Sequence, residues 1–478
     1  QLDFYHFPGK TMSALQLQFA QLKQAYSHSP YPDYQQRRQQ LTALRQAISQ
    51  HGDALCTAVS EDFGYRSSDE TRLLEIMPSL SGIDYHKKQL KSWLKPEKRH
   101  VHYSFMPASN RVMVQPLGVV GIIVPWNYPV YLALGPLMAA IAAGNKAMLK
   151  LSEYTPATNK VLTAICQQAL AADVMVIEGD AEIAAEFSRL PFDHLLFTGS
   201  TAVGRKVMQA AAANLTPVTL ELGGKSPVVI APDADIGQIA KRILFGKTAN
   251  AGQTCVAPDY VLVPADKLEL LISELCQAFS AFYPDFATNP DYSAIINKAQ
   301  YQRLMTMLEH AHSSGARVIN CDLNSDAATV NSERRLALQL IVGADDNSNL
   351  MEQEIFGPLL PLIPYHTLAE ALDYIQQRPR PLALYLMSND SDTQQQVLKQ
   401  THVGGVCIND TLVHVAQDDL PFGGIGPSGL GNYHGKEGFL RFSHQKAIHQ
   451  KGWFNSGRFI YPPFNRKMFK AILSWLTR

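Results

Sequence analysis

Short apolar runs alternate with amphipathic stretches between residues 118 and 223. Five of the runs have the length of a strand: 118–124, 146–151, and the segments VMVIEG, HLLFTGS and PVTLELG. The stretches between them, such as TPATNKVLTAICQQAL, space their apolar residues as helices do. Continuous apolar runs are typical of strands buried on both faces, so this alternation predicts a doubly wound parallel sheet. Ligands bind such sheets beyond the carboxyl ends of the strands.

The segments on either side carry different patterns. The first hundred residues are predicted to be helical, because Leu41, Leu44, Ile48 and Leu55 recur at spacings of three, four and seven. A second α/β alternation runs from SPVVIAPDAD to about residue 410 and predicts a separate lobe. Two flanking segments, 103–116 and 439–449, have the composition of exposed strands.

One apolar stretch is long enough to suggest a membrane span, since no charged residue occurs from Leu117 to Asn145. Pro125, Pro129 and Pro136 interrupt it, and β-branched residues crowd its first part. A buried strand, a turn and a buried helix explain this better. The first ten residues, QLDFYHFPGK, do not resemble a secretory signal peptide. We therefore expect a soluble, cytoplasmic protein.

The composition narrows the function classes. A chain of 478 residues with 46% hydrophobic content can form two large lobes and an appendage. Lys plus Arg and Asp plus Glu both number 42, so no nucleic-acid partner is expected. No CxxC pair and no Cys/His cluster occurs, which predicts no metal site and a reducing compartment. The six scattered cysteines are Cys56, Cys166, Cys255, Cys276, Cys321 and Cys407.

Polar residues follow several of the predicted strands. Asn127, in VPWNYPV, is either a turn residue or an amide donor to a developing oxyanion. Lys150 and Glu153 form either a solvated pair or contacts to ribose hydroxyls. Gly199 and Gly204 open a helix whose N-terminal amides could face a phosphate, although the pattern is not G-x-G-x-x-G.

Later motifs add groups that can react. Glu221 ends an apolar strand, where burial would raise its pKa and suit it to act as a general base. Cys255, in NAGQTCVAPDY, is by itself more typical of a small core residue than of a nucleophile. Glu354 and Phe356 lie in EIFGPLLP, and a glycine-rich segment begins at Pro421. Each signal is moderate alone, and together they are strong.

In chain order, VPWNYP, FTGS, ELGGKSP, GQTC, EIFGP and PFGGIGPSG resemble the motifs of the NAD(P)-dependent aldehyde dehydrogenase superfamily. The resemblance covers about residues 40–450. LPFDHLLFTGS and HVAQDDLPFGGIGPSGLGNYHGKEGF are most similar to its coniferyl aldehyde dehydrogenase-like, class 3-like branch. It implies an α/β fold with a Rossmann-like cofactor domain, an α/β catalytic domain and a small β oligomerisation element.

The implied domains follow the patterns above. They are an NAD(P)-binding domain (1–102 and 117–222), a catalytic domain (223–410), oligomerisation strands (103–116 and 439–450), a glycine-rich return segment (411–438) and a C-terminal tail (451–478). The tail places apolar residues on one helical face beside Lys467 and Lys470, and we interpret it as a helix that packs on this chain or a partner subunit. Peripheral membrane contact is the alternative. The apolar face comprises Phe469, Ile472, Leu473 and Leu476.

The resemblance also implies residue roles. Cys255 would be the nucleophile and Glu221 the general base, and Asn127 would share the oxyanion hole with the backbone N–H of Cys255. No metal is implied. The implied cofactor-binding residues are Val124, Pro125, Trp126, Lys150, Ser152, Glu153, Phe197, Thr198, Gly199, Ser200, Val203, Leu222, Gly223, Glu354 and Phe356.

The implied reaction oxidises an aldehyde to its carboxylic acid through a cysteine thiohemiacetal and a thioester. The substrate would be aromatic, such as coniferyl aldehyde, or medium-chain aliphatic, and the protein would form a homodimer. NAD is expected with NADP tolerated, because Glu153 should repel a 2′-phosphate whereas Lys150 and Ser152 could offset this. AADVMVIEGD lacks the Pro/Gly-rich segment usual before the third strand, next to the adenine pocket. A thiol-dependent esterase or acyl hydrolase and a structural protein that retains the fold are the alternatives.

Overall fold

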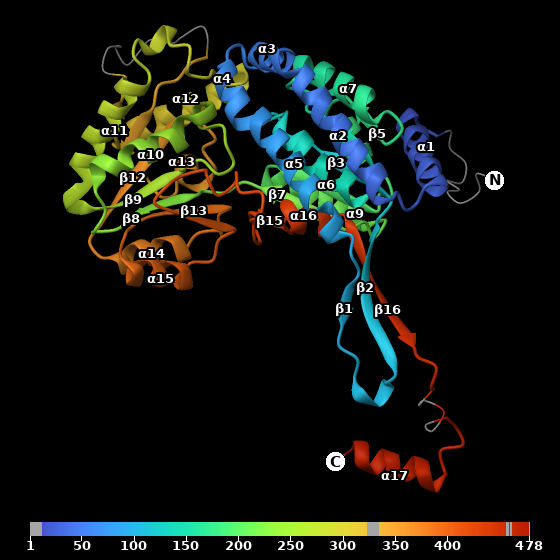
Figure 1. The fold of residues 1–478 in the computed structure, drawn as a ribbon. Coiled ribbons are helices and arrows are strands. Elements are labelled where there is room, and N and C mark those ends of the chain that lie inside the picture. Colours follow the sequence, from blue (N-terminus) through green and yellow to red (C-terminus); the bar gives the residue numbers. More distant parts are fainter. Residues whose placement is uncertain (1–11, 323–333, 456–457, 459–460, 478) are drawn as a thin grey trace.

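Two α/β lobes lie side by side, and a narrow sheet extends from one of them (Figure 1). The computed structural model describes residues 12–322, 334–455, 458 and 461–477. The first ten residues, in which we find no signal-peptide pattern, lie outside the described residues.

The first lobe contains a six-stranded sheet in the order β15-β7-β6-β3-β4-β5. From β3 the chain moves to β4 and β5 on one side and then crosses to β6 and β7 on the other. These five strands are parallel, which confirms the predicted doubly wound, Rossmann-like sheet. Only the short β15 runs antiparallel, against β7. The strands are β3 (Val119–Ile123), β4 (Lys146–Lys150), β5 (Val174–Ile177), β6 (His194–Gly199), β7 (Val218–Leu222) and β15 (Gly429–Leu430).

Helices cover this sheet. One of them, α6 (Tyr131–Ala143), is buried from Leu132 onward, which explains why the sequence around it carries no charge. Among the described residues, no helix is both long and apolar enough to cross a bilayer. The other helices of this lobe are α1 (Ala14–His28), α2 (Tyr34–Gln50), α3 (Gly52–Phe63), α4 (Ser68–Thr71), the π-helical η1 (Arg72–Ile76), α5 (Met77–Trp93), α7 (Pro156–Leu170), α8 (Ala181–Phe187), α9 (Thr201–Ala212) and α16 (Gly435–Arg441).

The second lobe contains a seven-stranded sheet in the order β10-β11-β12-β9-β8-β13-β14, and it confirms the second predicted α/β unit. Its strands are β8 (Pro227–Ile230), β9 (Tyr260–Pro264), β10 (Arg317–Asn320), β11 (Gln339–Val342), β12 (Leu359–Tyr365), β13 (Ala383–Met387) and β14 (Gly405–Ile408). Its helices are α10 (Ile236–Thr248), α11 (Leu268–Phe282), α12 (Lys298–Ser313), α13 (Asn349–Glu352), α14 (Leu368–Gln376) and α15 (Ser391–Gln400).

The narrow sheet contains β1 (Glu97–Arg99), β2 (Ala108–Pro116) and β16 (Ser443–Lys451). The two flanking segments form β2 and β16, which pair antiparallel along their whole length. The strand expected over 103–116 begins at Ala108 rather than 103, because Tyr103–Phe105 form a 3₁₀ turn, η2. The second strand begins at Ser443 rather than 439, because Phe439 is buried in α16 with its ring 5.3 Å from that of Trp93. β1 was not predicted, because its three charged residues, EKR, carry no apolar alternation.

Near the C-terminus, α17 (Lys467–Leu476) lies beyond the end of this narrow sheet (Figure 1). The tail is therefore helical, as predicted. Its Trp475 ring lies 5.9 Å from that of Tyr103, and Met468, Leu473 and Trp475 are exposed. The side chain of Leu476 falls outside the described part of the structure. What covers the apolar face stays a prediction.

Candidate active site

Glu221 is a buried carboxylate near the carboxyl end of β7. Its neighbours in the sheet are Thr198 of β6 and Gly429 of β15, and only 3% of the residue is exposed. Neither carboxylate oxygen has a hydrogen-bond partner among the described residues. Burial raises the pKa of Glu221 well above its ordinary value, and the charge of Arg441 lowers it only in part. A carboxylate in this state can accept a proton, as a general base must.

The segment that carries Cys255 has an unusual backbone. After α10, Asn250 and Ala251 have a φ of 52° and Gly252 has a φ of 76°. A Cβ on Gly252 would lie 2.5 Å from the carbonyl oxygen of Gly357, so only glycine lets these two loops approach so closely. Strained backbone of this kind is frequent at functional sites.

Gln253 fixes this segment from within. Its side-chain amide donates to the carbonyl oxygens of Asn250 (2.9 Å) and Ala294 (3.0 Å), and its Oε1 accepts from the N–H of Ile296 (2.9 Å). Gln253 is fully buried. The GQTC motif therefore contains a structural residue whose role we did not predict.

Cys255 is half-buried, whereas the other five cysteines are buried. Burial raises the pKa of its thiol, and the charges of Glu354 and Glu221 raise it further. The backbone N–H groups of Cys255 and Val256 act in the opposite direction, because they favour the thiolate. The charges of both glutamates thus act on the thiol, and either carboxylate is a candidate acceptor for its proton.

Asn127 follows β3, is 3% exposed and contacts the Cys255 segment. Its Nδ2 donates to the carbonyl oxygen of Gln253 at 3.1 Å, and its own carbonyl oxygen accepts from Nδ2 of Asn250 at 2.9 Å. The hydroxyls of Tyr128 and Thr254 lie 2.8 Å apart. The two loops predicted to share an oxyanion hole therefore bind each other directly.

Glu354 lies over Gly223 at the other side of the site. A Cβ on Gly223 would lie 2.0 Å from a carboxylate oxygen of Glu354, so glycine leaves room for this carboxylate in its present position. Burial and the charge of Asp259 raise the pKa of Glu354 to about 8. The Phe356 ring meets the Trp126 ring edge-on, with centroids 5.3 Å apart. These contacts bring together four of the predicted cofactor residues.

Lys225 and Asp259 support the Glu354 segment, a pair that the sequence analysis overlooked. Lys225 forms a salt bridge with Asp259 and donates to the carbonyl oxygens of Leu350 (2.7 Å) and Gln353 (3.0 Å). Asp259 accepts from the N–H of Ile355 at 3.0 Å. The sequence feature that could have indicated this pair is the lysine within the ELGGKSP motif, which is Lys225.

The predicted ribose contacts lie at the carboxyl end of β4, which Lys150 ends, and in the turn that follows. Lys150 is 2% exposed, and its Nζ donates to the carbonyl oxygen of Leu151 (2.8 Å) and pairs with Glu153 (3.4 Å). Buried Ser152 accepts from the N–H of Tyr154 at 3.2 Å. The Glu153 side chain is 40% exposed, so a ligand can approach its carboxylate from solvent.

The remaining predicted cofactor residues surround this edge of the sheet. Ser200 is the N-cap of α9, and its hydroxyl accepts from the N–H of Val203 at 3.4 Å. A Cβ on Gly204 would lie 2.6 Å from the Leu222 side chain, so glycine allows α9 to pack closely on β7. Val203 is exposed and Gly199 half-buried, whereas three further residues are buried: Val124, Phe197 and Thr198. Pro125 and Trp126 are half-buried.

These residues fit a dinucleotide. Oγ1 of Thr198 and Oε1 of Glu354 are buried with no hydrogen-bond partner in the described ranges, so both are available to ligand hydroxyls. Because Gly223 has no side chain, it leaves room for the Glu354 carboxylate above it. The α9 N-terminus presents backbone N–H groups suited to phosphate. Thr198, Gly223 and the α9 N-terminus lie at the carboxyl ends of a doubly wound sheet, where such ligands bind, and Glu354 comes from the second lobe.

Comparisons with known proteins point the same way. A "Probable coniferyl aldehyde dehydrogenase" of Pseudomonas aeruginosa is 51% identical over 468 residues, which is 98% of this chain and 97% of that protein. The substrate-bound structure of Staphylococcus aureus AldH superposes with a TM-score of 0.91 at 38% identity, covering 97% of this chain and 100% of the other. A Mycobacterium tuberculosis aldehyde dehydrogenase complexed with NAD+ has a TM-score of 0.82 at 26% identity, covering 91% and 89%.

The family assignment rests on a match along nearly the whole chain. The sequence model of the aldehyde dehydrogenase family matches residues 5–448. With the 51% identical relative, this match confirms the predicted NAD(P)-dependent aldehyde oxidation, and neither a hydrolase nor a structural role is favoured. The chain belongs to the aldehyde dehydrogenase family.

Proposed function

We propose that this protein oxidises an aromatic aldehyde of the coniferyl aldehyde type, with NAD as the preferred cofactor and NADP tolerated. The observation that carries the proposal is the hydrogen-bonded contact between the Asn127 loop and the Cys255 segment, beside an unpartnered Glu221. The name of the 51% identical Pseudomonas aeruginosa relative supports the substrate class. The exposed charge of Glu153 supports the preference for NAD.

In the first half of the reaction, the Cys255 sulfur attacks the aldehyde carbon and the carbonyl oxygen becomes an oxyanion. The thiol proton passes to a nearby carboxylate, Glu221 or Glu354, because the charges of both act on the thiol. It then leaves to solvent, so that Glu221 is ionised when the second half begins. The Asn127 amide and the backbone N–H of Cys255 hold the oxyanion of the thiohemiacetal. NAD(P)+, when bound, supplies the acceptor for the hydride that leaves the reacting carbon, and a thioester remains on Cys255.

In the second half, Glu221 takes a proton from water as the water attacks the thioester carbon. The C–S bond then breaks, which releases the carboxylic acid and restores Cys255 as the thiolate. The raised pKa of Glu221 makes it a stronger base than an ordinary carboxylate, which suits it to this proton transfer. Val124, Trp126, Lys150, Glu153, Thr198, Ser200, Glu354 and Phe356 would hold the cofactor along the sheet edge.

The assembly and location are also part of the proposal. The paired strands β2 and β16 extend from the first lobe and would join two copies into a homodimer (Figure 1). The apolar face of α17 would pack on the partner subunit, and peripheral membrane contact stays the alternative. A thiol nucleophile works in its reduced form, so we propose the cytoplasm as the compartment.

The test is formation of reduced nicotinamide with coniferyl aldehyde, benzaldehyde or hexanal and either NAD or NADP. We expect turnover that is fastest with an aromatic aldehyde and NAD, and a fall of about 10⁴-fold or more in Cys255→Ala. Cys166→Ala, which changes a buried cysteine in α7, should retain the wild-type rate. Faster turnover of hexanal would overturn the substrate class, and an active Cys255→Ala would overturn the nucleophile.

A further inference from the structure

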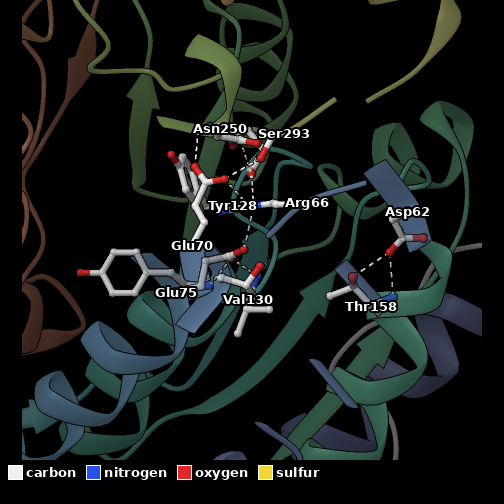
Figure 2. Close-up of polar contacts among 12 residues, drawn as sticks. Asp62, Arg66, Glu70, Glu75, Tyr128, Val130, Thr158, Asn250 and Ser293 are labelled. Atoms are coloured by element: carbon white, nitrogen blue, oxygen red, sulfur yellow. Dashed lines mark hydrogen bonds and ion pairs between the residues drawn. The ribbon is translucent and has the colours of Figure 1, made fainter. Parts of the chain in front are cut away.

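Behind the Asn127 loop lies a group of charged residues that the mechanism above does not use. Arg66, Glu70 and Glu75 come from the segment between α3 and α5 (Figure 2). The Arg66 and Glu75 side chains are both completely buried, and the Glu70 side chain is 14% exposed. Buried charges are costly unless they are paired, so each of these contacts has a structural consequence.

Glu75 holds the end of the Asn127 loop. Its Oε2 accepts from the backbone N–H groups of Val130 (2.7 Å) and Tyr131 (3.0 Å), and its Oε1 accepts from Arg66 (3.0 Å). These N–H groups belong to the first turn of α6, whose N-cap residue Val130 makes no side-chain cap. Glu75 itself lies in the π-helical turn η1. Such turns are rare in proteins overall, but those that occur are often found at functional sites.

Arg66 holds the middle of the same loop. One guanidinium nitrogen that bonds Glu75 also donates to the carbonyl oxygen of Asn127 at 3.2 Å. The guanidinium lies over the Tyr128 ring, 4.8 Å from its centroid. Asn250 donates to the same Asn127 oxygen at 2.9 Å. Two donors on one carbonyl fix the peptide plane that follows Asn127.

Glu70 ties this group to the segment that leads to Cys255. Its carboxylate accepts from the backbone N–H of Asn250 and, at 2.5 Å, from the hydroxyl of Ser293. It also lies 3.9 Å from Arg66 Nε. The Asn127 loop and the Cys255 segment are therefore both bonded to one ionic group, through Val130 and Asn250, which are among the residues labelled in Figure 2.

The consequence concerns the Asn127 amide. A side-chain amide nitrogen carries two N–H donors, and one of them already binds the Gln253 carbonyl oxygen. The other is left for the oxyanion. Because a donor contributes most when it is already aimed at the developing charge, a small rotation of this loop should lower the rate markedly.

We propose that Arg66 and Glu75 are positioning residues of the oxyanion hole, which act on the reaction through Asn127. The inference rests on the proposed role of Asn127. It goes beyond that role because it assigns a rate effect to two completely buried side chains that bind the backbone of the loop, Arg66 at the Asn127 carbonyl and Glu75 at the far end. Glu70 would act in the same way on the Cys255 segment.

Arg66→Lys is the sharpest test, because lysine keeps the charge but loses the planar group that bonds Glu75 and Asn127 together over Tyr128. We expect kcat to fall about 10- to 100-fold with coniferyl aldehyde, with less than a threefold change in aldehyde KM. Hydrolysis of 4-nitrophenyl acetate without cofactor should fall similarly, because the ester forms an oxyanion at the same place. Arg72→Lys, which changes an exposed arginine paired with Asp53, should match wild type in both assays.

A double-mutant cycle distinguishes positioning from general damage. If Arg66 acts through Asn127, Arg66→Lys should change kcat less than twofold when Asn127 is already alanine. Multiplied effects of the two substitutions would overturn the proposal, as would a wild-type rate in Arg66→Lys. If Arg66→Lys does not fold, Glu75→Gln takes its place in the same cycle, since it keeps the shape of the side chain. If the wild-type protein hydrolyses the ester but oxidises no aldehyde, the proposed function would be wrong. The double-mutant cycle could then still be measured with the ester.

Discussion

Two glutamates are buried near the candidate active site. Glu221 lies near the carboxyl end of β7 and is 3% exposed, whereas Glu75 lies behind the Asn127 loop and is 0% exposed. Burial raises the pKa of both. Glu75 has Arg66 and two backbone N–H groups as partners, whereas neither oxygen of Glu221 has one in the part of the chain that the structure describes. A carboxylate with every partner in place supports a structure, and one left without partners can exchange protons with a substrate or water.

The largest effect that this comparison predicts is on the reaction rate. Glu221→Gln keeps the shape of the side chain but cannot take a proton from water. We expect the steady-state rate to fall about 10²- to 10⁴-fold, the range typical of general acid–base catalysis. The thioester on Cys255 should then accumulate, because the first half of the reaction is affected less. Rapid mixing would show a burst of reduced nicotinamide close to one equivalent per site.

Glu75→Gln provides the contrast in the same experiment. It should lower the rate of the first half by misaligning Asn127. Reduced nicotinamide should then form slowly from the start, without the burst expected for Glu221→Gln. A Glu221→Gln enzyme with no burst and no accumulated thioester would mean that Glu221 does not serve deacylation. The assignment of the general base would then move to Glu354, whose pKa is raised to about 8.

The second effect is on stability, and the two glutamates should differ in sign. Glu75→Ala leaves Arg66 buried without its closest partner and should destabilise the fold by about 3–5 kcal/mol. Glu221→Gln removes a carboxylate that has no partner and should leave stability unchanged or higher at neutral pH. Denaturant unfolding of both variants beside wild type measures the difference.

The pH dependence of this difference follows from the raised pKa of Glu221. A raised folded-state pKa contributes stability below the unfolded-state value of about 4.3, and this contribution is lost as pH rises through the folded-state pKa. Wild type should therefore lose stability relative to Glu221→Gln as the pH is raised above about 4. A gap that stays constant over this range would show that Glu221 is ordinarily solvated and ionised.

The same comparison explains what could be predicted from sequence. Glu221 was identifiable because a charged residue in an apolar strand end is unusual, and Cys255 because its motif stands in order with five others. Arg66, Glu70 and Glu75 lie in a polar helical segment, RSSDETRLLE, that is typical of a solvated face. Their burial comes from tertiary contacts with the loops at 127–131 and 250, and a local pattern carries no record of these contacts.

A third carboxylate completes the series and gives the smallest expected effect. Glu153 is partnered, like Glu75, but its side chain is 40% exposed, so solvent screens its pair with Lys150. If Glu153 repels the 2′-phosphate of NADP, Glu153→Gln should shift the ratio of kcat/KM for NADP over NAD upward. Exposed charge pairs contribute up to about 1 kcal/mol, so we expect a shift of about fivefold at most.

The control for this change is Glu269→Gln, which removes an exposed glutamate paired with Arg317 in the other lobe and should leave the ratio unchanged. Raising the salt concentration should shrink the Glu153 effect, because a screened charge acts over about 10 Å or less. It should leave the Glu221 effect intact, because that carboxylate is buried and its contribution is proton transfer. A Glu153→Gln enzyme whose ratio does not move at low salt would place the 2′-phosphate away from this carboxylate. A preference for NAD would then need another cause, because Lys150 and Ser152 were expected to favour the 2′-phosphate and their polar atoms already bind this chain.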